Sequence, residues 1–355
     1  MKTEIMTPTD TALRYASGLL SEGQLVAFPT ETVYGLGANA LNPSAVLSIF
    51  AVKGRPADNP LIVHICDSSQ LSELCEVPET AFPLMDAFWP GPLTLLFPKK
   101  KSVPDEVTAG LPTVAVRMPS HPVAARLLRA SGLPIAAPSA NRSGRPSPTE
   151  AAHVMEDMKG KIPLILDGGP CSVGLESTVL DICHGQPCIL RPGGVTKEML
   201  ENVLHAEVAL AGSILRPLRP DEKALSPGMR YRHYAPQGII TLIEGTESDV
   251  VAALRTRVRA DAQEGYRSCV LCFSEHVDAL IECDPHDLGS DRNPAEIAQR
   301  LFTILRQLDQ EGIERIYSEV LPPEGIGLAV MNRLGRAAAF RTVSASEILS
   351  GAFSG

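Results

Sequence analysis

Polar side chains that could bind anions follow apolar segments in the N-terminal half of the sequence. They combine Lys and Arg cations with Ser and Thr hydroxyls and with glycines, whose backbone amides can approach a ligand closely. Such a lining suits a polyphosphate, and nearby helix N-termini would add positive potential. The groups occur in FPTETVYGLG (28–37), KGRPADNPLIVH (53–64), VAVRMPSHP (114–122), APSANRSGRPSPTE (137–150), GLESTV (174–179) and LRPGG (190–194).

Two arginines in these groups, Arg117 and Arg191, could each hold a carboxylate or a phosphate through two parallel hydrogen bonds. The sequence offers no evident nucleophile with its base and no evident acid–base pair. It also lacks the GxxxxGK[ST] phosphate loop, the HExxH zinc motif and the GxSxG nucleophile elbow. We therefore expect catalysis by positioning and by charge neutralisation.

Each candidate residue also has a purely structural interpretation. Ser147 opens the tetrapeptide SPTE, which has the pattern of a helix capping box with Pro at the first helical position. His64 ends an apolar segment and could be a satisfied core histidine. Lys53 and Arg55 could belong to a solvated helix end, where the helix dipole favours cations. The two threonines of PTET could simply close a turn.

The elements that would position these groups are short strands mixed with helices. Apolar runs predict strands in the interior of a sheet, and Gly35 and Gly37 indicate tight turns after the first strand. Helix starts are indicated by Asn42-Pro43, by the segment 120–122 and by SPTE. The predicted strands are QLVAF (24–28), LIVHI (61–65), LTLLF (93–97), TVAVR (113–117), PIAA (134–137), PLILD (163–167) and STVLDI (177–182).

The segment RPLRPDEKAL (216–225) is rich in Pro and charged residues, which is typical of a connector. After it, the pattern of predicted strands and helices changes. There, strands in GIITLIEG (238–245), RSCVLCFS (267–274) and IERIYSEV (313–320) alternate with helices at about 247–262, from Asn293-Pro294 onward, and within LAVMNRLGRAAAF (328–340). This alternation predicts a parallel, doubly wound sheet, and the missing GxGxxG argues against a dinucleotide site. The buried face of the helix that starts at Pro294 would contain Ile297, Leu301, Ile304, Leu305 and Leu308.

Length and composition indicate a two-domain globular protein of 355 residues, 44% of them hydrophobic and 21% charged. No apolar run is long enough to span a membrane, and MKTEIMTPTD lacks the features of a secretory signal, so we expect a cytoplasmic protein. The net charge of −9 argues against coating nucleic acid by bulk electrostatics. Among the eight cysteines only Cys269 and Cys272 form a CxxC, so we expect reduced thiols and no protein-bound metal.

Taken in order, PTETVYGLG, KGRPADNPLIVH, WPGPLT, VAVRMPSHP, PIAAPSANRSGRPSPT, GLESTV and LRPGG resemble the YrdC-like domain of the threonylcarbamoyl-AMP synthase family. The segments SPGMRYRHYAP (226–236) and NRLGRAA (332–338) resemble the longer, two-domain form of that family. The resemblance covers essentially the whole chain. It implies an α/β protein: a YrdC-like domain over 1–210, a linker acting as an active-site lid over 211–236, and a smaller Rossmann-like domain over 237–355. The YrdC-like domain would have a twisted mixed sheet, helices and a concave cationic cavity.

The activity that this resemblance implies is that of a nucleotidyltransferase. L-threonine, bicarbonate or CO2, and ATP would give threonylcarbamoyl-AMP and pyrophosphate, with Mg²⁺ expected alongside ATP. A carbamate formed from threonine would attack the α-phosphate, which agrees with the missing enzyme nucleophile. The product would feed the threonylcarbamoyl modification of adenosine in tRNA, completed by downstream transfer proteins.

Carried onto matching positions, the family's roles surround threonine with Thr32, His64, Arg117, Ala137 and Ser177. Arg117 would take the carboxylate, and the small Ala137 would leave backbone groups accessible. Lys53 and Arg55 become candidate stabilisers of transition-state charge, while Glu31 and Glu176 are unassigned and could only orient neighbouring cations. The implied ATP contacts are Lys53, Arg55, Asn59, Thr113, Ser139, Asn141, Ser147, Arg191, Ser226 and Tyr231.

Two other classes of protein share some of these features. A non-catalytic module that grips double-stranded RNA or tRNA would also present cationic loops, although a small residue at Ala137 fits a small ligand better; direct tRNA binding stays open. A carbamoyltransferase of the hydrogenase-maturation type resembles this chain in its YrdC-like domain. Those chains also carry Cys-rich zinc fingers, for which this sequence has no counterpart.

Overall fold

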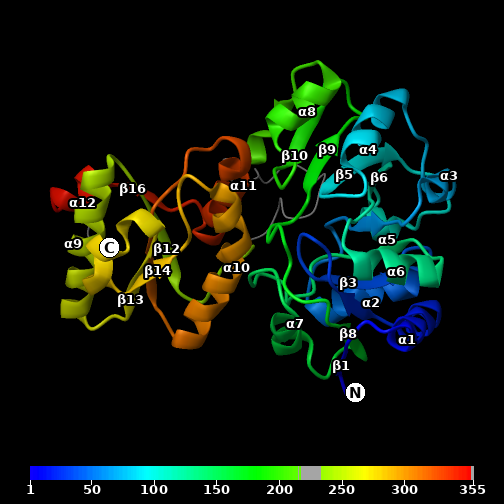
Figure 1. The fold of residues 1–355 in the computed structure, drawn as a ribbon, viewed down its shortest axis with the longest axis horizontal. Coiled ribbons are helices and arrows are strands. Elements are labelled where there is room, and N and C mark those ends of the chain that lie inside the picture. Colours follow the sequence, from blue (N-terminus) through cyan, green and yellow to red (C-terminus); the bar gives the residue numbers. More distant parts are fainter. Residues whose placement is uncertain (215, 217–232, 353–355) are drawn as a thin grey trace. The chain divides into compact units, whose positions relative to one another are not determined.

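The computed structural model of the chain describes residues 1–214, 216 and 233–352. These residues form two compact units, the first containing 1–143, 147–214 and 216, and the second containing 144–146 and 233–352. Most of the predicted linker over 211–236 lies outside the described residues, and so do Ser226 and Tyr231. Within each unit, helices pack against a sheet (Figure 1).

The first unit is built on an 11-stranded sheet in the order β1-β8-β2-β3-β7-β4-β6-β5-β9-β10-β11. Some neighbours are parallel, such as β4 with β6, and others are antiparallel, such as β5 with β6. This confirms the mixed sheet expected of the N-terminal domain. The strands are β1 (Glu4–Met6), β2 (Val26–Phe28), β3 (Gly35–Asn39), β4 (Ile62–His64), β5 (Leu93–Pro98), β6 (Thr113–Arg117), β7 (Ile135–Ala136), β8 (Leu164–Leu166), β9 (Thr178–Asp181), β10 (Cys188–Arg191) and β11 (Ala209–Leu210).

Local signals explain where several helices of the first unit begin. Asn42 caps α2 by accepting a hydrogen bond from Ala45 N, and Pro43 occupies the first helical position, as predicted. Apolar residues of α1 and α6 pack with those of β2 and β8 in one buried cluster. The helices are α1 (Asp10–Ser21), α2 (Pro43–Lys53), α3 (Leu71–Leu74), α4 (Phe82–Phe88), α5 (Asp105–Thr108), α6 (Pro122–Ser131), α7 (Ala151–Met158) and α8 (Lys197–Leu204), with 3-10 turns η1 (Ser68–Gln70), η2 (Glu79–Ala81) and η3 (Gly212–Ile214).

The prediction of tight turns at Gly35 and Gly37 was wrong, because both residues lie in strand β3. Close packing makes glycine necessary at Gly37. A Cβ there would come within 2.8 Å of the Phe28 ring and 2.9 Å of Ile135. Gly37 therefore lets side chains of the neighbouring strands β2 and β7 pack over β3, which is a different reason for glycine from the predicted turn.

The capping box predicted at SPTE was also wrong. Helix α7 begins at Ala151, and its N-cap residue Glu150 makes no side-chain capping hydrogen bond. Ser147 is fully buried and instead donates to Glu176 Oε1 at 2.5 Å. A hydrogen bond to a charged acceptor is stronger than one to a neutral group, which explains why the hydroxyl pairs with a distant carboxylate.

The second unit has a five-stranded parallel sheet in the order β14-β13-β15-β12-β16, which confirms the doubly wound prediction. All five apolar residues predicted on the inner face of α10 are buried. The sequence analysis missed β14, β16 and α12, which are too short to show a period. The elements are β12 (Ile239–Glu244), α9 (Glu247–Glu264), β13 (Ser268–Cys272), η4 (Ser274–His276), η5 (Asp278–Cys283), β14 (Pro285–Asp287), α10 (Pro294–Glu311), β15 (Arg315–Ser318), α11 (Gly325–Ala337), β16 (Thr342–Ser344) and α12 (Ala345–Leu349).

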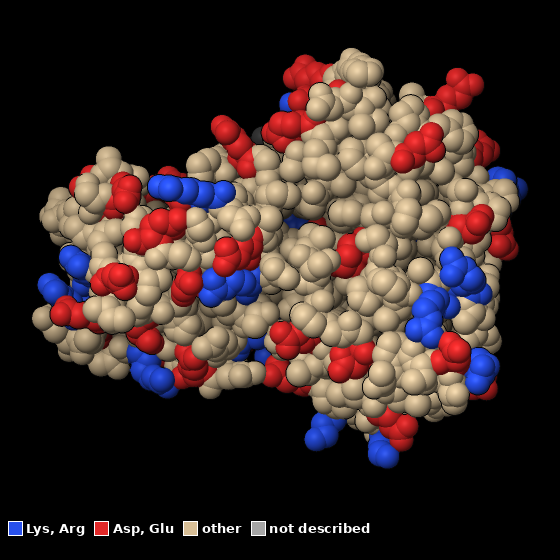
Figure 2. Space-filling view, in the orientation of Figure 1, with Lys and Arg blue, Asp and Glu red and all other residues tan. Residues whose placement is uncertain are grey.

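The surface carries charges of both signs. On the face drawn in Figure 2, Asp and Glu side chains are spread widely, with Lys and Arg between them. In the described part of the chain, no helix is both long and apolar enough to cross a membrane. All eight cysteines are free thiols, as expected.

Candidate active site

The sheet of the first unit brings several predicted site residues together at the end of β6. The parallel pairing of β4 with β6 places His64 opposite Arg117, and the antiparallel pairing of β5 with β6 places Thr94 opposite Arg117 on the other side. Ala137 follows β7, and its N–H donates to Ile62 O at 3.0 Å. The expectation of accessible backbone groups at Ala137 therefore fails for its N–H, because the sheet already uses that donor.

The Arg117 guanidinium is buried and held from several directions. Its Nε donates to Gly91 O at 3.2 Å and its Nη1 donates to Thr32 Oγ1 at 2.8 Å. Its Nη2 lies 2.6 Å from Glu31 Oε1. A guanidinium carries five N–H donors, so these contacts leave capacity for a further carboxylate. Arg117 is thus oriented in advance and still able to bind an anion.

Glu31 supplies the negative charge beside Arg117. Only 5% of Glu31 is exposed, and apart from the contact with Arg117 neither carboxylate oxygen has a partner with full hydrogen-bond geometry among the described residues. Burial acts to raise the pKa of Glu31, but the Arg117 charge and nearby N–H groups of Glu31 and Ser120 outweigh it and lower that pKa. The site therefore contains a buried carboxylate in its charged form whose hydrogen-bonding capacity is largely unused.

His64 is 4% exposed and uncharged at neutral pH. Burial lowers its pKa from 6.5 to about 3, and the positive charge of Arg117 acts in the same direction. Its ring packs edge-on against Phe28, while Nδ1 has no hydrogen-bond partner in the described part of the chain. Buried polar atoms almost always have a partner, so this unused nitrogen favours a ligand over a satisfied core histidine.

Ser177 links residues predicted to bind threonine with Arg191, which is predicted to bind ATP. Its Oγ lies 2.8 Å from Thr94 Oγ1, on the strand position opposite Arg117. Arg191 Nη2 donates to the same Ser177 Oγ at 3.2 Å, and Arg191 Nε donates to Ser177 O at 3.1 Å. Through Thr94 and Ser177, the structure thus connects Arg117 with Arg191 across four neighbouring strands, β6, β5, β9 and β10.

Lys53 holds the loop 139–141 in place, a role that the sequence did not predict. Its buried ammonium donates to Ser139 O at 2.5 Å, Asn141 O at 2.6 Å and Asn141 Oδ1 at 3.3 Å. Ser139 Oγ donates to the same Asn141 Oδ1 at 2.6 Å. Because an ammonium has three N–H donors, these contacts hold the loop 139–141 in place. The solvated-helix-end interpretation of Lys53 is therefore wrong.

The remaining predicted ATP residues in the described part of the chain are less tightly grouped. Arg55 Nη2 donates to the backbone carbonyls of Asn59 and Pro60, each at 3.1 Å. The Asn59 amide is fully buried, and neither its oxygen nor its nitrogen has a hydrogen-bond partner in the described residues. Thr113 starts β6, four residues before Arg117, which separates the two by roughly 13 Å along the strand.

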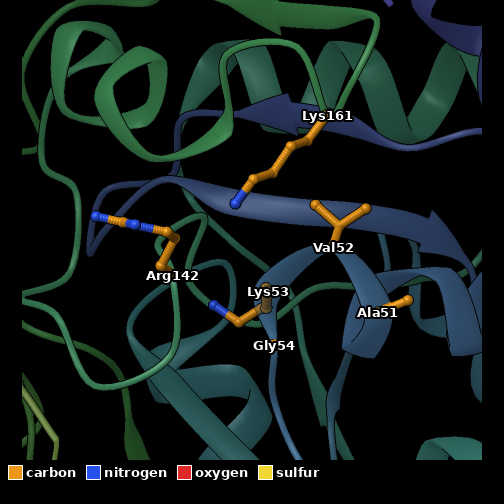
Figure 3. A pocket seen from close by; sticks show the side chains of 6 residues that line it. All are labelled: Ala51, Val52, Lys53, Gly54, Arg142 and Lys161. Atoms are coloured by element: carbon orange, nitrogen blue, oxygen red, sulfur yellow. The ribbon is translucent and has the colours of Figure 1, made fainter.

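An open cavity of about 520 Å³ lies at the C-terminal end of α2. Figure 3 shows the cations Lys53, Arg142 and Lys161 among the residues that line it. None of the predicted threonine residues is among them, and the Lys53 ammonium is engaged with the loop 139–141. The predicted threonine residues therefore lie at the buried Arg117 cluster and not in the lining of this cavity.

The sequence predicted no ligand-binding role for three contributors to the site. Glu31 pairs with Arg117, Glu176 accepts from Ser147, and Thr94 bridges to Ser177. The first two stand inside the recognised motifs PTET and GLEST, so their position between hydroxyl residues was the available signal. Thr94 belongs to an apolar strand, and its position opposite Arg117 becomes evident only from the strand pairing.

Comparisons with known proteins show which family this chain resembles along its length. Residues 18–193 match a family model of Sua5, YciO and YrdC proteins that is described as telomere recombination, and residues 195–339 match the model of the threonylcarbamoyl-AMP synthase C-terminal domain. The chain is 46% identical over 332 residues to threonylcarbamoyl-AMP synthase of Pyrococcus abyssi, covering 93% of this chain and 95% of that protein. It is 45% identical over 347 residues to the enzyme of that name from Bacillus subtilis, covering 96% and 97% respectively.

A solved structure is also similar to this chain over nearly its whole length. The crystal structure of P. abyssi Sua5 complexed with L-threonine superposes with a TM-score of 0.90 at 45% identity, covering 97% of this chain and 98% of that one. The motifs, the mixed and parallel sheets and these likenesses extend over nearly the whole chain, which belongs to the threonylcarbamoyl-AMP synthase family in its two-domain form.

Proposed function

We propose that this chain is an L-threonylcarbamoyladenylate synthase. It joins L-threonine, CO2 derived from bicarbonate, and ATP into threonylcarbamoyl-AMP and releases pyrophosphate. The observation that carries the proposal is the buried Arg117 cluster in a chain of this family: an oriented guanidinium lies beside His64, whose Nδ1 has no hydrogen-bond partner among the residues that the structure describes. Such a cluster suits a small anionic ligand with further polar groups.

Threonine would bind through the five residues around this cluster. Arg117 would hold the carboxylate with its remaining donors, while Thr32 and Ser177 offer hydroxyls nearby. The neutral His64 would offer Nδ1 to a polar group of the substrate, and Ala137 would leave room for it. Water exclusion follows from the burial of all five residues and would strengthen each of these interactions.

ATP would bind along the adjoining polar residues. Arg191 shares Ser177 with the threonine set, and the buried Asn59 amide has unused hydrogen-bonding capacity. Lys53 would act mainly by fixing the loop that presents Ser139 and Asn141. The connector residues Ser226 and Tyr231, which lie outside the described residues, remain proposed contacts by resemblance.

We propose that Mg²⁺ accompanies ATP as the complex of the triphosphate. In the described residues, no group of three or more His, Cys, Asp or Glu is arranged to hold a metal ion. Mg²⁺ keeps several waters and commonly uses substrate phosphate oxygens as ligands. The ion would therefore arrive with the nucleotide and neutralise charge on the phosphates.

The chemistry requires two anions to be held together without an enzyme nucleophile. The threonine nitrogen bonds to the carbon of CO2, and the resulting carbamate oxygen attacks the α-phosphorus of ATP. The bond from the α-phosphorus to the bridging oxygen breaks, and pyrophosphate leaves. Positive side chains that neutralise the attacking and leaving oxygens would supply most of the rate enhancement.

The test is direct identification of the products. The full-length protein incubated with ATP, L-threonine and bicarbonate should form threonylcarbamoyl-AMP, detected by mass spectrometry. Pyrophosphate release should require both threonine and bicarbonate. Release that is independent of either one would contradict the proposal.

The cellular setting proposed for this reaction is the cytoplasm, with transfer of the product to tRNA by downstream proteins. Free thiols at all eight cysteines are compatible with a reducing compartment. A non-catalytic RNA-binding role is disfavoured by the mixed charges of Figure 2 and by the buried position of Arg117. Binding of tRNA with no product formation would favour that role instead.

A further inference from the structure

We propose that Glu31 is a catalytic residue that binds the α-ammonium group of threonine and accepts one of its protons. The inference rests on the proposed function and adds the group that prepares the amine for attack on CO2. Threonine at neutral pH is a zwitterion, and its ammonium nitrogen has no free electron pair. A synthase of this kind therefore needs a proton acceptor beside the bound amino acid.

Geometry selects Glu31 for this task. Its Oε1 lies 2.6 Å from Nη2 of Arg117, the residue proposed to hold the threonine carboxylate. In an amino acid the ammonium and carboxylate groups are attached to the same carbon atom, so a carboxylate bound at Arg117 brings the ammonium within a few ångströms. The Arg117–Glu31 pair thus matches the two charges of the zwitterion, cation to carboxylate and anion to ammonium.

The unused hydrogen-bonding capacity of Glu31 is the second observation. Both of its oxygens are buried, and apart from the contact of Oε1 with Arg117 Nη2 neither has a partner with full hydrogen-bond geometry among the described residues. An ionised carboxylate normally accepts several hydrogen bonds, and burying one without them costs free energy. The N–H groups of a bound ammonium would give this carboxylate further hydrogen bonds. The other buried carboxylate of the site, Glu176, already accepts from Ser147.

Neighbouring groups favour proton transfer once threonine is bound. In the free protein the Arg117 charge holds the pKa of Glu31 down against the effect of burial. A threonine carboxylate on Arg117 would offset that charge, so that burial would then raise the pKa of Glu31. The other titratable groups facing Glu31 are His64 and His121, whose pKa values are lowered by burial, and Cys171, whose pKa burial raises to about 12. All three are uncharged at neutral pH.

The step balances without any other reactant. One N–H bond of the ammonium breaks, its electron pair stays on nitrogen, and the proton bonds to a Glu31 oxygen. The nitrogen pair then forms the bond to the carbon of CO2 while a C=O π pair moves to oxygen. A second proton leaves the new carbamic group to solvent, and Glu31 returns its own proton to solvent before the next turnover.

The test compares Glu31→Gln with wild type in the full-length enzyme. The amide keeps the size of the side chain and an oxygen acceptor toward Arg117, but it is a far weaker proton acceptor. At neutral pH we expect the rate of product formation at saturating threonine to fall roughly tenfold or more, since general bases contribute about 10²–10⁴-fold and a minority of free threonine already carries a neutral amine. The ratio of wild-type to variant rate should shrink as pH rises from 7 to 9, because solution then supplies more neutral amine.

A binding measurement separates this role from mere support of Arg117. The probe is the threonine analogue in which a hydroxyl replaces the ammonium group. Glu31→Gln should lose at least tenfold in threonine affinity by calorimetry while its affinity for the analogue changes little. Equal losses for both ligands would overturn the proposal and leave Glu31 as a support for Arg117.

Controls keep the two hypotheses distinct. Glu73→Gln changes an exposed carboxylate of the same unit and should behave as wild type. If wild type itself makes no threonylcarbamoyl-AMP, the proposed function fails. If wild type is active and Glu31→Gln matches it in rate at every pH and in threonine affinity, the inference about Glu31 fails alone.

Discussion

His64 and Arg117 lie directly opposite each other on the parallel strands β4 and β6, and both are more than nine-tenths buried. Burial disfavours the charged imidazole and the neighbouring Arg117 cation acts in the same direction, so the pKa of His64 is lowered and the ring stays neutral down to acidic pH. The strand pairing therefore makes His64 a neutral hydrogen-bonding group rather than a proton donor at physiological pH.

The neutral state of His64 makes the stability of the first unit depend on pH. The unfolded chain binds a proton at His64 below about pH 6.5, while the folded protein does so only near pH 3. The unfolded state thus gains protons first, and stability falls as pH drops from 6.5. We expect a loss of about 1.4 kcal/mol per pH unit from this residue, or roughly 2 kcal/mol by pH 5.

The measurement is urea unfolding of wild type and His64→Gln between pH 7 and pH 5. The difference in unfolding free energy between the two proteins should shift in favour of the variant as pH falls. Comparison with the variant removes the contributions of other histidines, including His276, whose pKa is raised by Glu247 and Glu319 against the effect of burial. A difference that is constant with pH would show that His64 does not carry the effect.

Arg117→Ala should weaken threonine binding far more than ATP binding. Losing a buried guanidinium that holds a carboxylate costs about 2–5 kcal/mol, which corresponds to a rise in Kd of about 30-fold or more. Calorimetric titration of each ligand checks this. Because the variant leaves Glu31 buried without its cation, the double variant Arg117→Met with Glu31→Gln should restore stability without restoring threonine binding. Equal losses for both ligands would contradict the assignment.

Ser147→Ala should lower both ATP affinity and stability. The variant removes the donor to Glu176, and a hydrogen bond to a charged group contributes about 1.5–3 kcal/mol. Adding Glu176→Gln should recover part of the stability, because a neutral amide loses less than a carboxylate when the Ser147 donor is absent, while ATP affinity stays reduced. Thermal melting and nucleotide titration separate the two effects. Normal ATP affinity in a folded Ser147→Ala protein would leave Ser147 a purely structural role.

Gly193→Ala should disrupt the start of strand β9, whereas Gly18→Ala should be harmless. A Cβ at Gly193 would lie 2.3 Å from Thr178 N and 2.5 Å from Glu176 O, and backbone atoms there have little freedom to shift. A Cβ at Gly18 meets nothing within 4 Å and lies inside α1, where Ala is favoured by up to about 1 kcal/mol. Melting temperatures should move in opposite directions. A Gly193→Ala protein as stable as wild type would contradict the close approach.

Arg306 of α10 should stabilise the second unit far more than Arg300 on the same helix. Arg306 is 1% exposed and donates to Pro146 O at 2.6 Å, while the Arg300 side chain is 38% exposed in its ion pairs with Asp287 and Glu296. Arg306→Met should cost about 1.5–3 kcal/mol, and Arg300→Met less than about 1 kcal/mol. Two measurements check the prediction. Chemical denaturation gives the free energy of unfolding, and hydrogen exchange reports on the Ala235 amide, which donates to Gly144 O. Equal effects would be the contrary result.

The sequence by itself determined the elements whose signals are local. Asn42 and Pro43 start α2 because capping involves residues only three apart, and the apolar stripe of α10 follows from the helical period. The apolar runs gave the interior strands, and the alternation after the connector gave the parallel sheet. The ordered motifs also sufficed to indicate the family, because each pairs a fixed residue type with a fixed spacing.

Tertiary structure alone decided what the site residues contact. Thr32 and Arg117 are 85 positions apart, Thr94 and Ser177 are 83 apart, and Lys53 and Ser139 are 86 apart. Ser147 does not cap a helix as predicted but donates to the carboxylate of Glu176, 29 positions away. Local patterns contain no information about such partners, because strand order and register bring them together. The charge state of His64 and the availability of Glu31 likewise depend on burial beside Arg117, which exists only after the sheet has formed.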